Sequence, residues 1–253
     1  MNDRSQTAEQ ARVAVVTGAA SGLGAAFAGR LAELGYDIAV CDLEPCDKTV
    51  AALRRLGRRA LGCAADAASP TDVDRFARSV HEQLGPVRVL VNNVGISPYT
   101  PFEQVTLEEW RRVMAANLDS LFLITRAFLE DMKALRWGRI VNMTSALAWD
   151  AQRRDVVPYV TSKLGVLGFT RSLATEVGQY GITVNAICPG IIRTARLDER
   201  VPERQWEIYR ERQAIKTIAE PADLLAALSL LVSDDARLMT AVNLPVHGGR
   251  VWP

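Results

Sequence analysis

The sequence predicts one doubly wound α/β domain, in which helices cover both faces of a mostly parallel, seven-stranded sheet. Short apolar runs alternate with longer amphipathic segments along the whole chain. The runs are apolar at nearly every position, which is typical of parallel strands that are buried on both faces. A chain of 253 residues suits one such domain, and its sequence contains no internal repeat or interdomain linker.

The expected elements alternate from one end of the chain to the other. Strands are expected at seven apolar runs: 13–16, 38–41, 60–63, 87–91, 139–143, 183–187 and 241–246. Helices are expected at the segments between them: 25–34, 49–56, 71–84, 107–135, 159–180 and 222–232. Right-handed crossovers then place the carboxyl end of every strand at one edge of the sheet, where ligands of such folds bind.

The first strand ends in a glycine-rich turn that predicts a dinucleotide site. The turn reads Thr17-Gly18-Ala19-Ala20-Ser21-Gly22-Leu23-Gly24, and the helix behind it ends at Gly35. Glycines let the backbone approach a pyrophosphate closely, and the N–H groups and dipole of a helix N-terminus attract its charge. Cofactor contacts are therefore expected from Gly18, Ser21, Gly22, Leu23 and Gly24.

Acidic residues follow the second and third strands. Asp42 lies 18 residues beyond Gly24, close to the spacing of the carboxylate that binds an adenosine ribose. A carboxylate there repels a 2′-phosphate, which favours NAD over NADP, whereas the alternative is a solvated turn acid. Asp66, followed by Ala67, can accept a hydrogen bond from an adenine amino group or act as a cap or turn residue.

The fourth strand and the helix after it contribute asparagines. The strand leads into Asn92-Asn93-Val94-Gly95, whose amides and glycine can lie along a cofactor, although ordinary turns have the same composition. Asn117 interrupts the long helical segment 107–135. Because asparagine is a poor helix former, the sequence by itself favours a cap or kink there over a catalytic role.

The fifth strand and the helix after it supply three reactive side chains. Ser145 follows the strand, and Tyr159 and Lys163 share one helical face because they lie four residues apart. A lysine ammonium beside a tyrosine stabilises the phenolate. Lowering a tyrosine pKa from about 10 to about 7 takes roughly 4 kcal/mol, which requires a cationic nicotinamide ring and a low-dielectric pocket besides the lysine.

The ordered set of motifs resembles the classical short-chain dehydrogenase/reductase family. The resemblance extends from about residue 11 to residue 249. It rests on Thr17-Gly18-x-x-x-Gly22-x-Gly24, Asp66, Asn92-Asn93-x-Gly95, Asn117, Ser145, Tyr159-x-x-x-Lys163, Asn185, Pro189-Gly190 and Thr194. It implies a single-domain Rossmann fold over residues 12–253.

The family pattern implies a role for each matching residue. Tyr159 is the acid/base, and Ser145 holds the substrate oxygen. Lys163 binds the nicotinamide ribose and lowers the tyrosine pKa, while Asn117 holds a helix kink and a water that links Lys163 to solvent. Residues that border the cofactor complete the expected site: Asp66, Ala67, Asn93, Val94, Gly95, Pro189, Gly190, Ile192 and Thr194.

The sequence departs from the family pattern in four places. Val94 replaces an alanine, and the 14-residue interval from Ser145 to Tyr159 is slightly longer than usual. Thr240-Ala241 stands where Thr-Gly is frequent, and His247-Gly248-Gly249 replaces Asp-Gly-Gly. These changes concern the cofactor contact, the loop before the tyrosine and the packing of the C-terminal segment.

The resemblance implies an NAD-dependent oxidoreductase that reversibly converts a secondary alcohol to a ketone, with similarity to bacterial aryl-alcohol dehydrogenases. An NADP-linked carbonyl reductase and a non-catalytic NAD-binding or sensing protein are the alternatives. In the family the helices at 107–135 and 159–180 often pack into tetramers, so a homotetramer is expected.

Substrate choice is expected to depend on residues 146–158 and on a lid near residues 195–216. Arg153 or Arg154 can bind a substrate carboxylate or remain solvated. Aromatic side chains can line an apolar pocket or serve ordinary packing: Tyr99, Trp149 and Trp206.

The composition argues against several other classes of function. A net charge of +1 argues against electrostatic binding to nucleic acid or anionic membranes, and no apolar stretch approaches the ~20 residues of a membrane span. Four cysteines without a Cys-x-x-Cys pair and two histidines predict no metal site, and reduced thiols in a cytoplasmic protein. Residues 1–11 lack the apolar core of a signal peptide and are expected to form a flexible tail.

Overall fold

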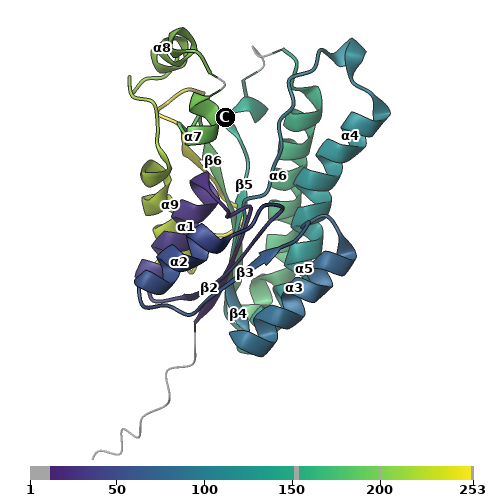
Figure 1. The fold of residues 1–253 in the computed structure, drawn as a ribbon, viewed down its shortest axis with the longest axis vertical. Helices are drawn as coiled ribbons and strands as arrows, with labels where there is room; N and C mark the ends of the chain where they lie inside the picture. Colours follow the sequence, from purple (N-terminus) through teal and green to yellow (C-terminus); the bar gives the residue numbers. More distant parts are fainter. Residues whose placement is uncertain (1–11, 151–153, 200, 252–253) are drawn as a thin grey trace, which may run out of the picture.

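The computed structural model describes residues 12–150, 154–199 and 201–251, which form a parallel seven-stranded sheet between two layers of helices (Figure 1). All six strand pairs are parallel, which confirms the predicted doubly wound sheet. The strands are β1 (Val13–Thr17), β2 (Asp37–Asp42), β3 (Ala60–Ala64), β4 (Val87–Asn92), β5 (Gly138–Met143), β6 (Ile182–Pro189) and β7 (Asn243–Val246).

The strand order locates the functional edge of the sheet. The order is β3-β2-β1-β4-β5-β6-β7, so the chain runs outward from β1 through β2 to β3 and then returns to β4 on the other side of β1. Folds of this kind bind ligands outside the carboxyl ends of the strands, where the winding direction reverses. The carboxyl ends of β1 and β4 are therefore the expected position of the site.

Two sets of helices cover the sheet, one on each face (Figure 1). The first set is α1 (Gly22–Glu33), α2 (Asp47–Arg55) and α9 (Leu225–Val232). The second set is α3 (Pro70–Gln83), α5 (Ser120–Leu135) and α6 (Val157–Val177). Three other helices lie near the carboxyl edge or precede α5: α4 (Leu107–Met114), α7 (Ala195–Asp198) and α8 (Glu203–Glu211).

The strand β1, which lies inside the sheet between β2 and β4, contributes to two separate cores. Ala14 and Val16 pack in the core under α1, whereas Val13 and Val15 pack in the core under α3 and α5. All four side chains are fully buried. Successive residues of a strand point to opposite faces, so a run without polar positions requires a helical layer on each face.

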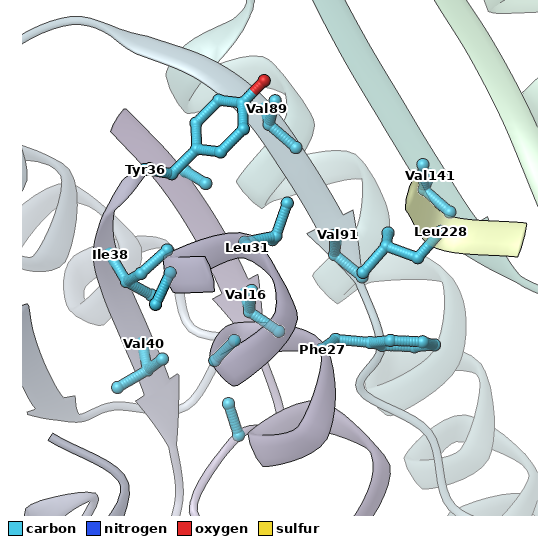
Figure 2. Close-up of a cluster of buried hydrophobic side chains, with 14 of the residues drawn as sticks. Val16, Phe27, Leu31, Tyr36, Ile38, Val40, Val89, Val91, Val141 and Leu228 are labelled. Atoms are coloured by element: carbon cyan, nitrogen blue, oxygen red, sulfur yellow. The ribbon is translucent and has the colours of Figure 1, made fainter. Parts of the chain in front are cut away.

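The core under α1 fixes the helix that begins at the glycine turn. Figure 2 shows Phe27 and Leu31 of α1 among the valines of the sheet and Leu228 of α9. Phe27 and Leu31 are fully buried. Burial of such a side chain contributes about 1.5–3 kcal/mol, which holds the N-terminus of α1 rigidly over the end of β1.

The expected long helix at 107–135 is interrupted. A π-helical turn, Ala115–Asp119, separates α4 from α5 and contains Asn117. The Asn117 side chain leaves the helix to bond with Ile96 and Ser162. Widening of the backbone hydrogen-bond ladder accommodates this contact, as is common for π-turns at functional sites. The interruption expected from the asparagine is confirmed.

The last strand is shorter than expected because of Ala241. This residue adopts a φ angle of 61°, in the left-handed region that strand residues do not occupy. The strand β7 therefore begins at Asn243 rather than at residue 241. The left-handed conformation explains why glycine is frequent at this position in the family, since glycine adopts it without a Cβ penalty.

Within the described ranges, none of the helices has the length and hydropathy required to cross a membrane. The same residues contain no group of three or more His, Cys, Asp or Glu side chains arranged to hold a metal ion. All four cysteines are free thiols. The tail expected at residues 1–11 lies outside the part of the chain that the structure describes.

Candidate active site

A cleft of about 440 Å³ lies at the carboxyl edge of the sheet, at the switch point between β1 and β4. It brings together predicted cofactor residues from the glycine turn and from the segments after β2, β3, β4 and β6. These residues are Gly18, Ser21, Gly22, Leu23, Asp42, Asp66, Ala67, Asn93, Val94, Gly95 and Thr194. Residues far apart in the sequence thus form one continuous lining.

The glycine turn permits close approach of a ligand to the backbone. Gly18 and Gly22 have φ angles of 63° and 60°, which strain any residue with a Cβ. Gly24 is required for a different reason, which is close packing of the helix against the turn. A Cβ on Gly24 would overlap the Gly18 carbonyl group and would lie only 2.8 Å from its carbon atom. Ser21 makes no capping side-chain bond to α1. The orphan N–H groups at this helix start therefore suit a phosphate.

Side chains from other elements hold the turn in place. The Asn93 side-chain amide donates to the carbonyl oxygens of Thr17 at 3.1 Å and Gly18 at 2.9 Å. The Thr49 hydroxyl of α2 donates to the carbonyl oxygen of Ala19 at 2.9 Å. Asn93 thus supports the cofactor turn through its amide. Sequence reasoning misses Thr49, because nothing in its local pattern signals a contact with the turn.

Asp42 ends β2 and lines the cleft. Its carboxylate accepts hydrogen bonds from the backbone N–H groups of Ala20 at 3.0 Å and Glu44 at 3.3 Å. These bonds hold an acid at the end of the second strand, the position of the ribose-binding carboxylate in dinucleotide folds. Asp66 also lines the cleft, but its carboxylate accepts from the Ala68 N–H at 2.8 Å, as expected for the alternative of a turn residue.

A second cavity of about 330 Å³ lies against the cleft. Leu23, Gly95 and Thr194 line both spaces, so a ligand in one would contact a ligand in the other. Four further predicted residues line the second cavity: Ser145, Tyr159, Gly190 and Ile192. Four of the predicted catalytic and cofactor-binding residues line neither space: Gly24, Asn117 and Lys163, which are buried, and Pro189 at the end of β6.

Ser145 and Tyr159 line the second cavity together, and the Ser145 hydroxyl is near enough to the Tyr159 oxygen to act on its pKa as a hydrogen-bond partner. The Ser145 hydroxyl oxygen also accepts from the Leu147 N–H at 3.2 Å, which fixes its position at the end of β5. Burial raises the pKa of Tyr159 to about 12, and the bond with Ser145 offsets only part of this change. Desolvation of the phenolate thus outweighs the polar contacts that the protein itself supplies. The expected lowering of the tyrosine pKa, which requires a cationic nicotinamide ring beside the lysine, stays a prediction.

Lys163 lies one helical turn after Tyr159 and is only 4% exposed. Its ammonium donates to the Met143 carbonyl oxygen at 2.8 Å and lies 5.7 Å from the centre of the Tyr159 ring. Burial lowers the pKa of Lys163 to about 8. A Cβ added to Gly95 would lie 3.1 Å from this ammonium, so the lysine reaches the wall shared by the two cavities.

Asn117 joins the segment after β4 to α6. Its side-chain oxygen accepts from the Ile96 N–H at 2.8 Å, and its amide donates to the Ile96 carbonyl at 3.0 Å and the Ser162 hydroxyl at 2.8 Å. The residue is 2% exposed. Because Ser162 lies between Tyr159 and Lys163 on α6, Asn117 positions both. The water relay implied by the family stays a prediction.

The helices α7 and α8, which fall in the predicted lid segment, lie beyond the upper end of the sheet in Figure 1. Tyr209 of α8 lines the second cavity, as Tyr99 does. Trp206 is 2% exposed and packs edge-to-face against Tyr209, with ring centres 6.0 Å apart. It therefore supports the lid without lining the cavity. Trp149 borders a separate pocket of about 270 Å³.

The predicted substrate-binding arginines do not line the cavity in the described part of the chain. Arg154 is exposed, and Arg153 lies outside the described residues. The charged residue that lines the cavity is Arg250, which forms an ion pair with Asp150 at 2.8 Å. Sequence reasoning misses it, although its place shortly after β7 puts it at the same edge as the other strand ends. The Arg250 N–H donates to Nδ1 of His247 at 3.2 Å, which accounts for one role of that unusual histidine.

Comparisons with known proteins identify the class to which this arrangement belongs. The model of the short chain dehydrogenase family matches residues 12–205. The chain belongs to this family and is an oxidoreductase. It is 37% identical over 243 residues to the BbsD subunit of the hydroxy(phenyl)methyl-succinyl-CoA dehydrogenase of Thauera aromatica, covering 95% of this chain and 97% of the relative.

Other relatives share the fold along almost the entire chain. The D-beta-hydroxybutyrate dehydrogenase of Rhizobium meliloti is 31% identical over 253 residues, with 94% of this chain and 98% of the relative covered. An actinorhodin polyketide ketoreductase variant solved with NADPH superposes with a TM-score of 0.89 at 33% identity, covering 95% of this chain and 97% of that one. NAD+-bound xylitol dehydrogenase gives a TM-score of 0.88 at 28% identity, covering 95% and 100%. The neighbours therefore include proteins with either cofactor.

Proposed function

We propose that the protein reversibly oxidises a secondary alcohol to a ketone with NAD. One observation carries the proposal: the Ser145–Tyr159 pair lines a cavity that shares a wall with a cleft suited to a dinucleotide. The shared wall would bring a substrate carbon and a nicotinamide ring into contact. Positioning of two reactants in this way is a large part of catalysis in hydride transfer.

The described side chains suit the proton transfer of this reaction. Tyr159, as the acid/base, would remove the hydroxyl proton of the alcohol, and Ser145 would hold the same oxygen as its charge changes. Lys163, when protonated, would stabilise the phenolate from the adjacent turn of α6. A bound nicotinamide dinucleotide supplies the hydride acceptor for oxidation and the donor for reduction.

Asp42 supports NAD as the cofactor. Its carboxylate is held at the end of β2 by two backbone N–H groups and lines the cleft. A 2′-phosphate next to this carboxylate would bring two negative charges together in a partly enclosed space, which is unfavourable. An NADP-linked carbonyl reductase, the second candidate, is supported by the NADPH-bound neighbour.

The lining of the second cavity supports a substrate with apolar bulk beside the alcohol carbon. Tyr99, Leu147, Leu197 and Tyr209 contribute apolar surface to it. The relative from Thauera aromatica carries a phenyl group in the name of its substrate, in agreement with an aryl alcohol. The hydroxybutyrate dehydrogenase relative supports a small hydroxyacyl compound instead.

We further propose a cytoplasmic homotetramer. Phe122 of α5 and Leu164 of α6 are 48% and 45% exposed, and such apolar side chains on neighbouring long helices favour burial between subunits. Free thiols, as at all four cysteines, are typical of a reducing compartment. A monomeric mass in light scattering at working concentration would contradict the assembly.

Replacement of Tyr159 tests the proposed reaction. Tyr159→Phe keeps the ring and removes the proton-transferring oxygen, so kcat should fall by at least about 100-fold while NADH affinity changes little. Tyr180→Phe is the matched control, because Tyr180 follows α6 and contacts Lys133, outside both cavities. Absorbance of NADH at its nicotinamide band would be followed over aryl alcohols, hydroxy acids and cyclic diols. Retention of substantial turnover by the Tyr159 variant would contradict the role of the tyrosine.

A further inference from the structure

Arg250 lies in the wall of the substrate cavity although its charge is nearly hidden from solvent. Its side chain is 6% exposed, and it follows β7 at the carboxyl edge of the sheet. Among the described residues that line the cavity, it is the one with a charged side chain. A buried charge in a largely apolar lining is costly unless it is paired and hydrogen-bonded.

The partner of Arg250 is Asp150, in the loop that follows Ser145. The arginine Nη2 and Nε atoms lie 2.8 Å and 3.3 Å from the same carboxylate oxygen. The Asp150 side chain is 10% exposed. The two opposite charges therefore lie together inside the protein, and the wall of the cavity carries little net charge at this point.

One other contact holds the guanidinium in the wall, and another fixes the backbone that carries it. Its central carbon lies 5.7 Å from the ring centre of Tyr209 in the lid helix α8. The Arg250 backbone N–H donates to His247 Nδ1 at 3.2 Å. Two segments of the chain thus hold the side chain in one orientation, the loop after β5 and the helix α8, while the bond to His247 fixes the Arg250 backbone. A donor held in this way has lost its flexibility before a ligand arrives, which favours specific recognition.

We propose that Arg250 is a specificity-determining residue that donates a hydrogen bond to a second, uncharged oxygen of the substrate, such as a ketone or ester carbonyl. The inference rests on the proposed alcohol oxidation, since it places the reacting oxygen at Tyr159 and the second oxygen at Arg250. A guanidinium has five N–H donors, and the pair with Asp150 uses those on Nε and Nη2 along one side. The rest of the group can serve a ligand in the cavity that Arg250 lines.

The charge of Asp150 determines which oxygen the site accepts. A substrate carboxylate on the same guanidinium would lie close to the Asp150 carboxylate, and like charges in a low-dielectric site repel strongly. An uncharged carbonyl oxygen gains the charge-assisted hydrogen bond without this repulsion. Asp150 is therefore expected to exclude the free hydroxy acids whose esters the site accepts.

Two variants and one control test this assignment in the full-length enzyme. Arg250→Met keeps the length of the side chain and removes its donors, whereas Asp150→Asn keeps the shape of its partner and removes the negative charge. Arg154→Met is the control, because Arg154 is exposed and does not line the cavity. The probes are ethyl 3-hydroxybutyrate, ethyl 4-hydroxypentanoate and ethyl 5-hydroxyhexanoate, each compared with its free acid and with the unbranched 2-alkanol of equal chain length.

The expected results separate recognition from mere packing. Arg250→Met should lower kcat/KM at least about tenfold for the best ester and less than about threefold for the matching 2-alkanol. Asp150→Asn should raise kcat/KM for the free acid relative to the ester at least about tenfold. Arg154→Met should change neither ratio, and a fluorescence titration with NADH should give the same affinity for all variants.

Five results would overturn the inference. If Arg250→Met lowered kcat/KM equally for the ester and the 2-alkanol, Arg250 would have only a packing role. If the wild-type enzyme preferred the free acid to its ester, Asp150 would not be masking the charge of Arg250. If Asp150→Asn left the ratio of kcat/KM for acid and ester unchanged, the charge of Asp150 would have no part in this selectivity. Turnover of alkanols without any advantage for esters overturns this inference alone, whereas no turnover of any probe with NAD overturns it together with the proposed function.

Discussion

Gly24 and Gly29 lie in the same helix, and the structure predicts opposite effects of the same substitution at the two positions. A Cβ on Gly24 would lie 2.8 Å from the Gly18 carbonyl carbon and 2.7 Å from the Asn93 side-chain nitrogen. Nonbonded heavy atoms normally approach to about 3.5–4.0 Å, so the turn would have to move by about 1 Å. A Cβ on Gly29 meets no atom within 4 Å.

The magnitudes follow from these contacts. Overpacking against backbone in Gly24→Ala should lower the free energy of unfolding by about 1–3 kcal/mol, or a melting temperature by about 2–12 °C. NADH affinity should fall at least about tenfold, because the displaced Gly18 belongs to the cleft. Gly29→Ala should raise the free energy of unfolding by about 0.5–1 kcal/mol through helix propensity, with NADH affinity unchanged.

Thermal unfolding and a fluorescence titration with NADH measure both effects. The paired design removes general consequences of replacing glycine by alanine in α1, since both residues lie between Gly22 and Glu33. A Gly24→Ala protein that melts at the wild-type temperature and binds NADH normally would refute the reasoning, because the turn would then tolerate a Cβ in contact with Gly18. A lower free energy of unfolding in Gly29→Ala would refute the assumption that helix propensity determines the effect of this substitution.

Three further predictions concern charge and strain. Asp42→Ala should raise kcat/KM with NADP relative to NAD at least about tenfold, because the charge that repels a 2′-phosphate is removed; an unchanged ratio would exclude this role. Ala241→Gly should raise the melting temperature by about 1–4 °C, since glycine relieves a φ of 61° at some cost in chain entropy, and a lower melting temperature would show that no strain is stored there. The pKa of Lys163 is lowered to about 8 from its ordinary 10.5, so the unfolded chain binds more protons between these pH values and stability rises with pH. In the wild-type protein the free energy of unfolding should therefore rise by up to about 3 kcal/mol from pH 8 to 10, and Lys163→Met should abolish this rise. Denaturant unfolding of both proteins over this pH range measures the difference.

The fold could be predicted because it depends on local patterns that the chain repeats. The apolar runs predict buried parallel strands, and each strand of the structure overlaps the run expected for it. The glycine turn is equally local, since its φ angles and its helix start are properties of consecutive residues. Ala241 shows the limit of this reasoning, because only its backbone conformation explains where β7 begins.

The remaining features of the site depend on contacts between distant residues. The Arg250–Asp150 pair joins residues 100 positions apart, and the bond of Thr49 to the glycine turn spans 30 positions. No local periodicity encodes such pairs, since they are set by how strands and loops meet at one edge of the sheet. Arg154, the exposed candidate from the sequence, illustrates the consequence. A charge near the tyrosine in sequence is not necessarily near it in space.

The burial of Tyr159 and Lys163 determines how a proton could move in the proposed reaction. With the pKa of Tyr159 near 12, a phenolate at pH 7 costs about 7 kcal/mol. The Lys163 ammonium lies 5.7 Å from the centre of the Tyr159 ring, and when protonated it contributes only about 3 kcal/mol to a negative charge at such a distance, at the effective dielectric of protein sites. The lysine therefore cannot maintain a phenolate by itself, and it loses its own charge above about pH 8. The oxygen of Tyr159 should then become basic only when a bound substrate and a positively charged cofactor complete the site, which couples proton removal to the presence of both reactants.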